Sequence, residues 1–335
     1  MTIRTILSNT QFSHKKVLEK LIAHRLDESV ARVLSHLDLE ISDEDMIWIQ
    51  TSYNAYALDK KPLEYILGYV EFLWYRFEVD QHTLIPRPET EYMITAVVQA
   101  LKLLPTTDNQ QPITHLIDVW TGCGVLGISC ILHGAEYLDQ VYLTEYYPET
   151  LEVARRNLES YKKSCQNDNS TTDIQQLATS KILNNTQLLH CSLLDHPVLQ
   201  EVIMPTTSNQ QPITNIIIVA NLPYIPEQLF EDNVEDNVKL WEPKPAFVGG
   251  EDGLDWYREM LDQVISNQKQ VAGIQEQVSS IQQLTTDKQH PITLFLEMMT
   301  WQVDILRQAY KNHFSFEEVA TFHMNIRIVK STTLS

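Results

Sequence analysis

The sequence predicts an α/β protein with a doubly wound, mostly parallel sheet, preceded by a small N-terminal helical domain. Apolar runs of strand length at 116–119, 141–144, 216–220 and 292–297 alternate with longer segments whose apolar residues recur at helical spacing. A glycine-containing turn at 120–124 joins one of these runs directly to a helix. With 335 residues, the chain is long enough for two domains.

The composition is strongly acidic. Lys and Arg together number 25 and Asp and Glu 44, which gives a net charge of −19. This charge repels phosphate backbones and suits a basic protein partner, so we expect no nucleic-acid substrate. The first ten residues lack the apolar core of a signal peptide, and no stretch approaches the ~18 apolar residues of a membrane span. We therefore expect a cytoplasmic protein without membrane contact.

The cysteines show neither CxxC pairing nor the neighbouring histidines of a zinc site. They are Cys123, Cys130, Cys165 and Cys191. We interpret them as reduced thiols, as in cytosolic proteins, and expect no metal.

Residues 1–68 are predicted to form the helical domain. Apolar residues recur at helical spacing over 17–22 and 30–37, and Ser42, with acidic residues behind it, opens a third helix that runs through Tyr56. Nothing in this region is typical of a catalytic site, which favours a packing or docking role.

The pattern then changes to aromatic and β-branched residues, which predicts a β-hairpin linker over 69–86. The linker leads into a segment in which prolines flank Arg87 on both sides, and a helix over 89–104 follows. We expect this braced segment to form one wall of a site. The sheet domain is assigned to 87–335.

The turn at 120–124 has the features of a cofactor site. Gly122 and Gly124 let backbone N–H groups approach a ligand closely, and the next helix adds positive potential at its N-terminus. The following strand ends in Glu145, and an acid at this place usually binds ribose hydroxyls. A third strand ends around 190–194, where an adenine would lie beside the turn. The sequence thus predicts a nucleoside cofactor.

The apolar run 216–220 predicts a buried strand, and Asn221, Leu222, Pro223 and Tyr224 follow it directly. The asparagine offers a carbonyl acceptor. The residue before the proline is held extended, which points its main-chain carbonyl away from any helix, and the tyrosine supplies a flat face. This set suits a planar NH2 group, because two oxygens can accept its two hydrogens. The same tetrapeptide also fits a core strand that simply ends at its proline.

The remaining segments are predicted from their pattern alone. Residues 162–186 are polar and are interpreted as an insertion, and the glutamine-rich stretch 263–289 favours one or two solvated helices. A helix from Trp301 and two short strands over 316–330 end the chain. A nine-residue motif, which we expect to form polar loops at the entry edge of the sheet, recurs with changes at 106–114, 206–214 and 285–293.

Several motifs together resemble the protein N5-glutamine methyltransferases of the HemK/PrmC type, which methylate the glutamine of the Gly-Gly-Gln loop of class I peptide chain release factors. The resemblance runs from about residue 61 to residue 306. It is carried by Pro62-Leu63, Leu67-Gly68, Glu71-Phe72, the segment 84–91, Asn221-x-Pro-Tyr-Ile, the segment 242–254 and Tyr257-Arg258. The resemblance implies the seven-stranded, Rossmann-like sheet of the class I methyltransferases.

The resemblance also implies the ligands and their sites. S-adenosylmethionine would be the methyl donor and S-adenosylhomocysteine the product, without a metal. The implied cofactor site consists of Asp118, Trp120, Thr121, Gly122, Cys123, Gly124, Glu145, Leu193 and Asn221. The implied substrate site consists of Arg87, Pro88, Glu89, Asn221, Leu222, Pro223 and Tyr224, with Asn221, Pro223 and Tyr224 in the catalytic role. The helical domain would dock the release factor, and we expect a monomer.

The implied mechanism depends on positioning. An amide nitrogen is a poor nucleophile because its lone pair is delocalised into the carbonyl. The side-chain oxygen of Asn221 and the main-chain carbonyl of Leu222 would hold both amide hydrogens, which orients the lone pair toward the sulfonium methyl group. No strong base is needed, because the proton leaves after methyl transfer.

Three positions depart from the family pattern. Leu222 replaces a proline, Trp120 replaces the first glycine of the cofactor turn, and Met299 stands where a glycine follows Glu297 by two residues. The tryptophan has three interpretations: the turn is rearranged, the protein is a non-catalytic relative, or codon 120 is a UGA that the source organism reads as glycine. Sequencing the gene tests the third.

Other functions share part of these motifs. Asn-Leu-Pro-Tyr is typical of ribosomal RNA adenine N6 dimethyltransferases, and related motifs occur in DNA adenine methylases, because an exocyclic adenine NH2 poses the same geometric problem. The surplus of 19 acidic residues argues against both. Methylation of a glutamine on a ribosomal protein and a non-catalytic binding role both remain open at this stage.

Overall fold

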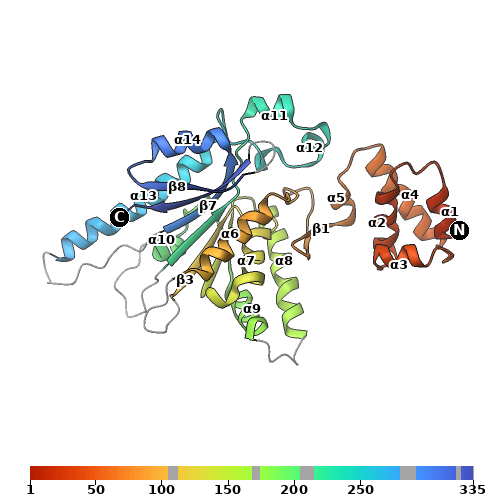
Figure 1. Ribbon diagram of the computed structural model, residues 1–335, viewed down its shortest axis with the longest axis horizontal. Helices are drawn as coiled ribbons and strands as arrows, with labels where there is room; N and C mark the ends of the chain where they lie inside the picture. The colour runs from red at the N-terminus through yellow and green to blue at the C-terminus, as the bar shows by residue number, and fades with distance from the viewer. Residues whose placement is uncertain (105–111, 168–173, 204–214, 280–291, 322–325, 335) are drawn as a thin grey trace.

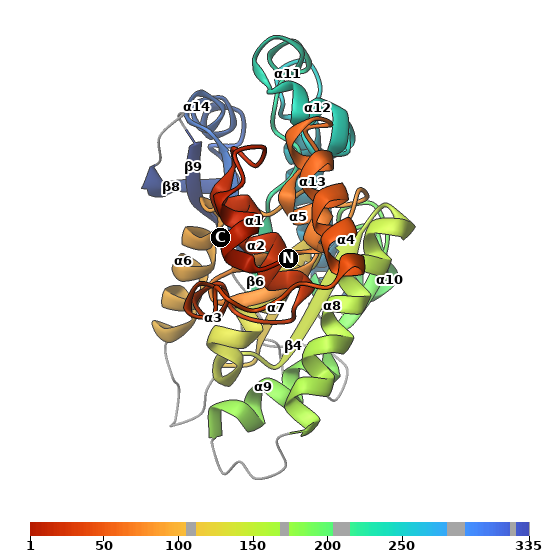
Figure 2. The same ribbon diagram turned by 90° about the vertical axis from the view of Figure 1, so that its right-hand side faces the viewer.

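The computed structural model describes residues 1–104, 112–167, 174–203, 215–279, 292–321 and 326–334. A group of short helices at the N-terminus lies to one side of a larger domain, which is built on a central sheet (Figure 1). In Figure 2, which looks from the N-terminal side, these helices lie in front of the sheet domain. The repeated motif falls largely outside the described residues.

The N-terminal part consists of α1 (Ile3–Ser8), α2 (Lys15–Arg25), α3 (Val30–Ser35), α4 (Asp43–Ala57) and α5 (Leu63–Leu67). The three predicted helices are α2, α3 and α4. Ser29 and Ser42 cap α3 and α4, because their hydroxyls accept hydrogen bonds from backbone N–H groups three residues later. The buried side chains of this part, such as Leu18 and Ile22, form a core of their own.

The predicted hairpin connects the two parts. Strands β1 (Tyr69–Phe72) and β2 (Tyr75–Glu78) pair antiparallel through a two-residue turn. Phe72 and Phe77 point into the core of the sheet domain, so the hairpin packs against that domain.

The sheet contains β3 (Thr114–Val119), β4 (Gln140–Glu145), β5 (Gln187–His190), β6 (Asn215–Ala220), β7 (Ile292–Met299), β8 (Phe314–Thr321) and β9 (Ile326–Thr333). Their order is β5-β4-β3-β6-β7-β9-β8. The first five are parallel, and β9 runs antiparallel to both β7 and β8. This confirms the predicted fold, a doubly wound and mostly parallel sheet of the class I methyltransferase type. The strand order reverses between β3 and β6, where such sheets form a cleft.

Helices cover both faces of the sheet. One face carries α6 (Thr90–Lys102), α7 (Val125–Gly134), α8 (Pro148–Asn167) and α9 (Ile174–Asn185), whose buried side chains share one core. The other carries α10 (Pro197–Ile203), α13 (Asp255–Ser279) and α14 (Thr300–Ala309) over a second core. Short helices η1 (Ala135–Tyr137), α11 (Glu227–Asn233), α12 (Asp236–Trp241) and η2 (Lys244–Ala246) lie in the connections.

The stretch 162–186, interpreted as a polar insertion, is helical for much of its length. Helix α8 continues to Asn167, and α9 packs on the sheet with Ile182 and Leu183 buried. These apolar residues lie among many polar ones, which hid the helical period. The glutamine-rich stretch begins inside the single long helix α13, and its part from 280 lies outside the described residues.

Candidate functional site

A cavity of about 300 Å³ opens at the carboxyl ends of β3, β4 and β6, beside the place where the strand order reverses. Its volume lies at the lower end of the range of small-ligand sites, roughly 300–1,000 Å³. The predicted site residues that line it are Trp120, Thr121, Gly122, Cys123, Glu145, Asn221 and Pro223. The ends of three parallel strands thus bring predicted cofactor and substrate residues to one cavity.

Asp118 holds the glycine turn from inside. Its side chain is fully buried and accepts hydrogen bonds from Thr121 Oγ1 at 2.5 Å and from the N–H of Gly127 at 2.8 Å. A Cβ on Gly127 would lie only 3.0 Å from the Asp118 carboxylate, so a glycine lets helix α7 approach the strand. Burial raises the pKa of Asp118 to about 6. Asp118 therefore shapes the turn and does not line the cavity.

Glu145 holds the same turn from the second strand. Its Oε1 accepts hydrogen bonds from the N–H groups of Tyr146 and Tyr147 at 2.8 and 3.1 Å, and its Oε2 accepts one from Gly122 at 3.1 Å. Burial raises the pKa of Glu145 to about 7. Because one hydrogen bond from the described residues, that of Gly122, reaches Oε2, this oxygen keeps acceptor capacity for a ligand hydroxyl in the cavity.

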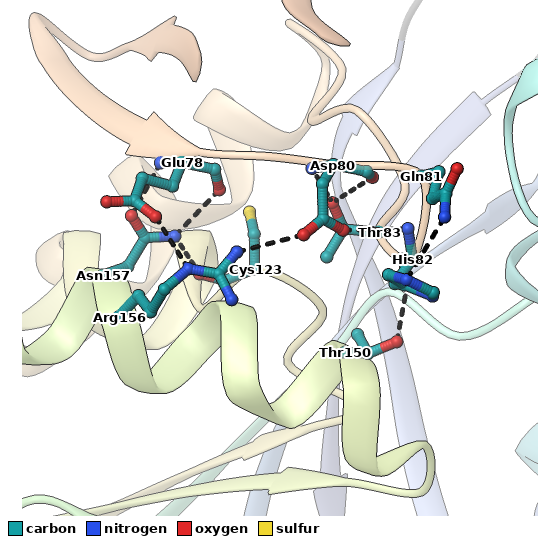
Figure 3. Close-up of polar contacts among 9 residues, drawn as sticks. All are labelled: Glu78, Asp80, Gln81, His82, Thr83, Cys123, Thr150, Arg156 and Asn157. Atoms are coloured by element: carbon teal, nitrogen blue, oxygen red, sulfur yellow. Dashed lines mark hydrogen bonds and ion pairs between the residues drawn. The ribbon is translucent and has the colours of Figure 1, made fainter. Parts of the chain in front are cut away.

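The end of the hairpin, at Glu78, is tied to the glycine turn by Asn157 on α8 (Figure 3). The buried side chain of Asn157 accepts a hydrogen bond from the N–H of Glu78 at 2.6 Å and donates to the Glu78 carbonyl at 2.9 Å. It also donates to the carbonyl of Cys123 at 2.8 Å. One amide therefore joins the linker to the cavity wall.

Two further contacts fasten the linker to α8 (Figure 3). Arg156 forms ion pairs with Glu78 and Asp80 at 2.8 and 3.0 Å. Thr150 Oγ1 donates to the carbonyl of His82 at 2.6 Å. As a result, the stretch around His82 lines the cavity, which the sequence did not indicate.

Trp120 fills one side of the cavity. Its ring centre lies 4.8 Å from that of Trp256 and 6.1 Å from that of Tyr146, which is nearly parallel to it. Leu193, predicted to lie near an adenine, is fully buried in the second core, against which the indole packs, and does not line the cavity. The indole therefore lines the cavity while its ring contacts those of Trp256 and Tyr146.

Asn221 is the first residue after β6 and lines the cavity. Its Nδ2 donates to Thr90 Oγ1 at 3.3 Å, and Thr90 Oγ1 donates to Glu297 Oε2 at 2.9 Å. The hydroxyl of Tyr224 donates to the other oxygen of the same carboxylate at 3.2 Å. Burial raises the pKa of Glu297 to about 7. A linked set of side chains thus surrounds the amide.

The main-chain carbonyl of Leu222 keeps acceptor capacity. Among the described residues, the carbonyl accepts one hydrogen bond, from the hydroxyl of Tyr257 at 3.3 Å, and that hydroxyl lies closer, at 2.5 Å, to the carbonyl of Glu297. The single proton of Tyr257 therefore goes mainly to Glu297. The side chain of Leu222 is buried and does not line the cavity.

The next two carbonyls are surrounded by protein. Tyr224 O accepts a hydrogen bond from Gln302 Nε2 at 2.7 Å. Pro223 O packs so closely on Gly249 that a Cβ there would lie 2.2 Å from it, and a Cβ on Gly253 would lie 2.1 Å from Tyr224 O. Gly249 and Gly253 thus let the chain fold tightly over this turn.

The proline-braced segment is anchored by Arg87. Its guanidinium donates to Glu242 Oε1 at 2.7 Å, and Glu242 Oε2 accepts a hydrogen bond from the N–H of Ile85 at 3.0 Å. Arg87, Pro88 and Glu89 do not line the cavity, although the residues on either side of them do. The wall of the cavity is formed here by Pro86 and Thr90, on either side of these three residues.

Thr90, Asn157 and Glu297 were not among the predicted site residues. Thr90 lies two residues after the second of the prolines that flank Arg87. Glu297 is an acid at the end of an apolar strand, and this pattern could have marked it as a candidate site residue. Asn157 lies in the middle of a helix, where no local pattern marks it. Among the described residues, no group of His, Cys, Asp or Glu is placed to hold a metal, and no helix is long and apolar enough to cross a membrane.

Known proteins share this sequence pattern. No family model matches the chain. A release factor glutamine methyltransferase of Bacillus cereus is 27% identical over 249 residues, 73% of each chain. One of Thermodesulfovibrio yellowstonii is 26% identical over 263 residues, 78% of this chain and 77% of the relative. A solved structure, the N-terminal domain of human METTL16 in complex with SAH, is 10% identical, covers 98% of each chain and has a TM-score of 0.45.

The likeness extends well beyond the short motifs, and the resemblance predicted from them is confirmed. Over about three quarters of its length, the chain is similar in sequence to release factor glutamine methyltransferases, and its sheet is that of a class I methyltransferase.

Proposed function

We propose that the protein transfers a methyl group from S-adenosylmethionine to the side-chain amide nitrogen of a glutamine, in the Gly-Gly-Gln loop of a class I peptide chain release factor. The observation that carries this proposal is Asn221. Its amide lies at the end of a central strand and lines the cavity, beside the glycine turn. The curated relatives support the substrate class.

The residues around Asn221 suit a carboxamide substrate. Asn221 Oδ1 and the carbonyl of Leu222 can each accept one hydrogen of the substrate NH2 group, because neither is fully occupied by the protein. With both hydrogens held, the nitrogen lone pair has one direction. Holding that direction replaces a random encounter by a fixed approach, and this is the largest contribution expected from the protein.

The cavity fits much of the cofactor. Gly122 and Gly124 have φ values of 61° and 87° and carry no side chain, so the backbone of the turn leaves room for a ligand. Their N–H groups are held within the turn, by Glu145 Oε2 at 3.1 Å and by the Thr121 carbonyl at 2.9 Å. Glu145 Oε2 keeps room for a hydroxyl donor. When bound, S-adenosylmethionine supplies an electrophilic methyl group. Trp120 does not fit this picture, because its ring fills one side of the cavity.

We further propose that the N-terminal helices dock the release factor. Trp241 at the end of α12 donates its indole N–H to the carbonyl of Asp59 at 2.9 Å, and the Lys61 ammonium lies 5.5 Å from the same ring. The segment after α12 lines the cavity with Pro243 and Pro245. A partner bound to the helices would therefore lie close to the cavity, and the acidic chain would attract a basic one.

Transfer of tritiated methyl from S-adenosylmethionine tests the proposal. Acceptors are a bacterial class I release factor, the same factor with glutamate in place of the loop glutamine, ribosomal proteins and ribosomal RNA. Both the chain as sequenced and Trp120→Gly are assayed. We expect label in the unchanged release factor alone. Label that appears only in RNA would show an adenine methyltransferase, and label only in ribosomal proteins would show the sister activity.

A further inference from the structure

We propose that Thr90 and Glu297 are positioning residues that fix which end of the Asn221 amide faces the cavity. This rests on the proposed function, because the facing end matters only if the amide binds a substrate NH2 group. The two residues belong to the start of α6 and the end of β7, and they meet Asn221 at the end of β6. They are 2% and 1% exposed, so solvent does not compete for their bonds.

The direction of each hydrogen bond follows from the number of protons available. A threonine hydroxyl has one proton, and an ionised carboxylate can only accept. Thr90 must therefore give its proton to Glu297, at 2.9 Å, and it can then only accept from its other neighbour. That neighbour is Asn221, so its NH2 group turns toward Thr90, at 3.3 Å, and its oxygen is left for the cavity.

The opposite orientation would prevent substrate binding of the proposed kind. If Asn221 turned by 180°, its NH2 group would face the NH2 group of the substrate, and two donors would oppose each other. An asparagine amide has nearly the same shape in both orientations, so packing alone selects neither. The charge on Glu297 selects one of them, both through Thr90 and through its own hydrogen bond with the Asn221 side chain.

The surroundings of Glu297 keep this arrangement in place. Tyr224 donates to its second oxygen at 3.2 Å, and the Tyr257 hydroxyl binds its backbone carbonyl. Glu89 is the other charged group that acts on it, and it raises the pKa of Glu297 in the same direction as burial does. Burial raises the pKa of Glu297 to about 7, so the assays are run at about pH 8, where most of this carboxylate is ionised.

Thr90→Val tests the proposal, because valine keeps the shape and removes the hydroxyl. We expect kcat for glutamine methylation to fall at least about tenfold at constant Kd for S-adenosylmethionine, and Thr90→Ser to restore most of it. In an Asn221→Ala background, Thr90→Val should have no further effect, since no amide remains to be oriented. Glu297→Ala should follow the same pattern as Thr90→Val.

The outcomes separate this inference from the proposed function. A parent enzyme that methylates no glutamine either with Trp120 or with Trp120→Gly contradicts the proposed function. An active parent whose kcat is unchanged by Thr90→Val contradicts the positioning role, and so does an equal loss from Thr90→Val in the presence and absence of Asn221. The exposed Thr95 on the same helix offers a matched control, because Thr95→Val should leave kcat unchanged.

A different observation carries a second inference, which concerns two tryptophans. Leu73 and Trp74 form the two-residue turn between β1 and β2, with φ values of 46° and 70°. Positive φ at both residues defines the type I′ hairpin turn, whose second position strongly favours glycine. The side chain of Trp74 is 100% exposed, so no packing compensates for the unfavourable backbone.

Trp120 repeats this conflict at the cofactor turn. Its φ is 55°, and its indole N–H is buried without a hydrogen-bond partner among the described residues. A bulky residue is thus found in left-handed backbone, and an unpaired donor is buried. A glycine would remove both costs and would open the space beside Tyr146.

We infer that positions 74 and 120 carry glycine in the natural protein, because UGA codons at both places are read as glycine in its source organism. The chain has only nine glycines among 335 residues, about 3% against a usual ~7%. The other tryptophans, Trp48, Trp241, Trp256 and Trp301, have ordinary negative φ. Among the tryptophans, the conflict is therefore confined to positions 74 and 120, although Asp27, Lys60, Leu73 and Leu193 also have positive φ.

The codons and the native peptides decide this inference. We expect UGA at codons 74 and 120 and glycine at both positions by mass spectrometry of the protein from its own cells. A UGG codon or a tryptophan peptide at either position overturns it. In the recombinant chain, Trp74→Gly should raise the Tm by about 2–4 °C, whereas Trp301→Gly, at the second residue of helix α14, should lower it.

Trp120→Gly should lower the Kd for S-adenosylmethionine at least about tenfold, which calorimetry measures. Unchanged or weaker binding would contradict the role assigned to the indole.

Discussion

Asn221→Ala is expected to lower kcat for glutamine methylation by about 10²-fold or more, while the Kd for S-adenosylmethionine changes little. The methyl side chain of alanine cannot accept a hydrogen bond from the substrate. The substrate NH2 group is then held at one point only, and its lone pair has no fixed direction. The glycine turn and Glu145, which form the other side of the cavity, are untouched. Single-turnover kinetics and calorimetry measure the two quantities separately.

The matched control is Asn184→Ala, at an exposed asparagine on α9 far from the cavity in sequence and structure. It should leave both quantities unchanged. Full methylation by Asn221→Ala would contradict the amide-holding role. A parallel loss of cofactor binding and of kcat would instead assign Asn221 to the cofactor alone.

Arg87→Ala is expected to destabilise the sheet domain by about 3 kcal/mol or more, because it leaves a buried carboxylate without its charge partner. The Glu242 side chain is only 2% exposed and lies 2.7 Å from the guanidinium. Glu242→Gln should cost less, since glutamine still accepts from the N–H of Ile85 and the 35% exposed Arg87 can turn to solvent. Urea unfolding of both variants measures the difference.

The exposed ion pair between Arg4 and Asp38 is the control for this prediction. Arg4→Ala should change the free energy of unfolding far less than Arg87→Ala, because solvent screens an exposed pair. Equal costs for Arg4→Ala and Arg87→Ala would contradict the view that the buried pair anchors the wall of the cavity. A larger cost for Glu242→Gln than for Arg87→Ala would contradict it as well.

Periodicity and turn residues predicted most of the fold. Buried parallel strands are continuous apolar runs, so β3, β6 and β7 could be predicted from the sequence. The glycine turn at 120–124 predicted the start of helix α7. Helix α9 was missed because its apolar residues Ile182 and Leu183 lie in a polar context. A helix that buries only a narrow stripe gives a weak signal.

The site was predicted where its chemistry is local in sequence. Asn221 was found because the residues after a buried strand end at the edge of the sheet. Its partners could not be found in this way. Thr90 lies 131 positions from Asn221 in the sequence, and Thr90 and Glu297 lie 207 positions apart. Contacts at such separations depend on strand order, which local patterns do not specify. The contact between the rings of Trp120 and Trp256 also joins residues far apart in the sequence, so no local pattern predicted it.

The central claim is that an amide held by Asn221 receives the methyl group, and the site of methylation tests it most directly. The release factor is incubated with enzyme and S-adenosylmethionine, and its loop peptide is sequenced by tandem mass spectrometry. We expect one added methyl group on the side-chain nitrogen of the loop glutamine, and with Asn221→Ala a yield at least about 10²-fold lower over the same short incubation. A methyl group on any other residue, or an equal yield with Asn221→Ala, would contradict the claim.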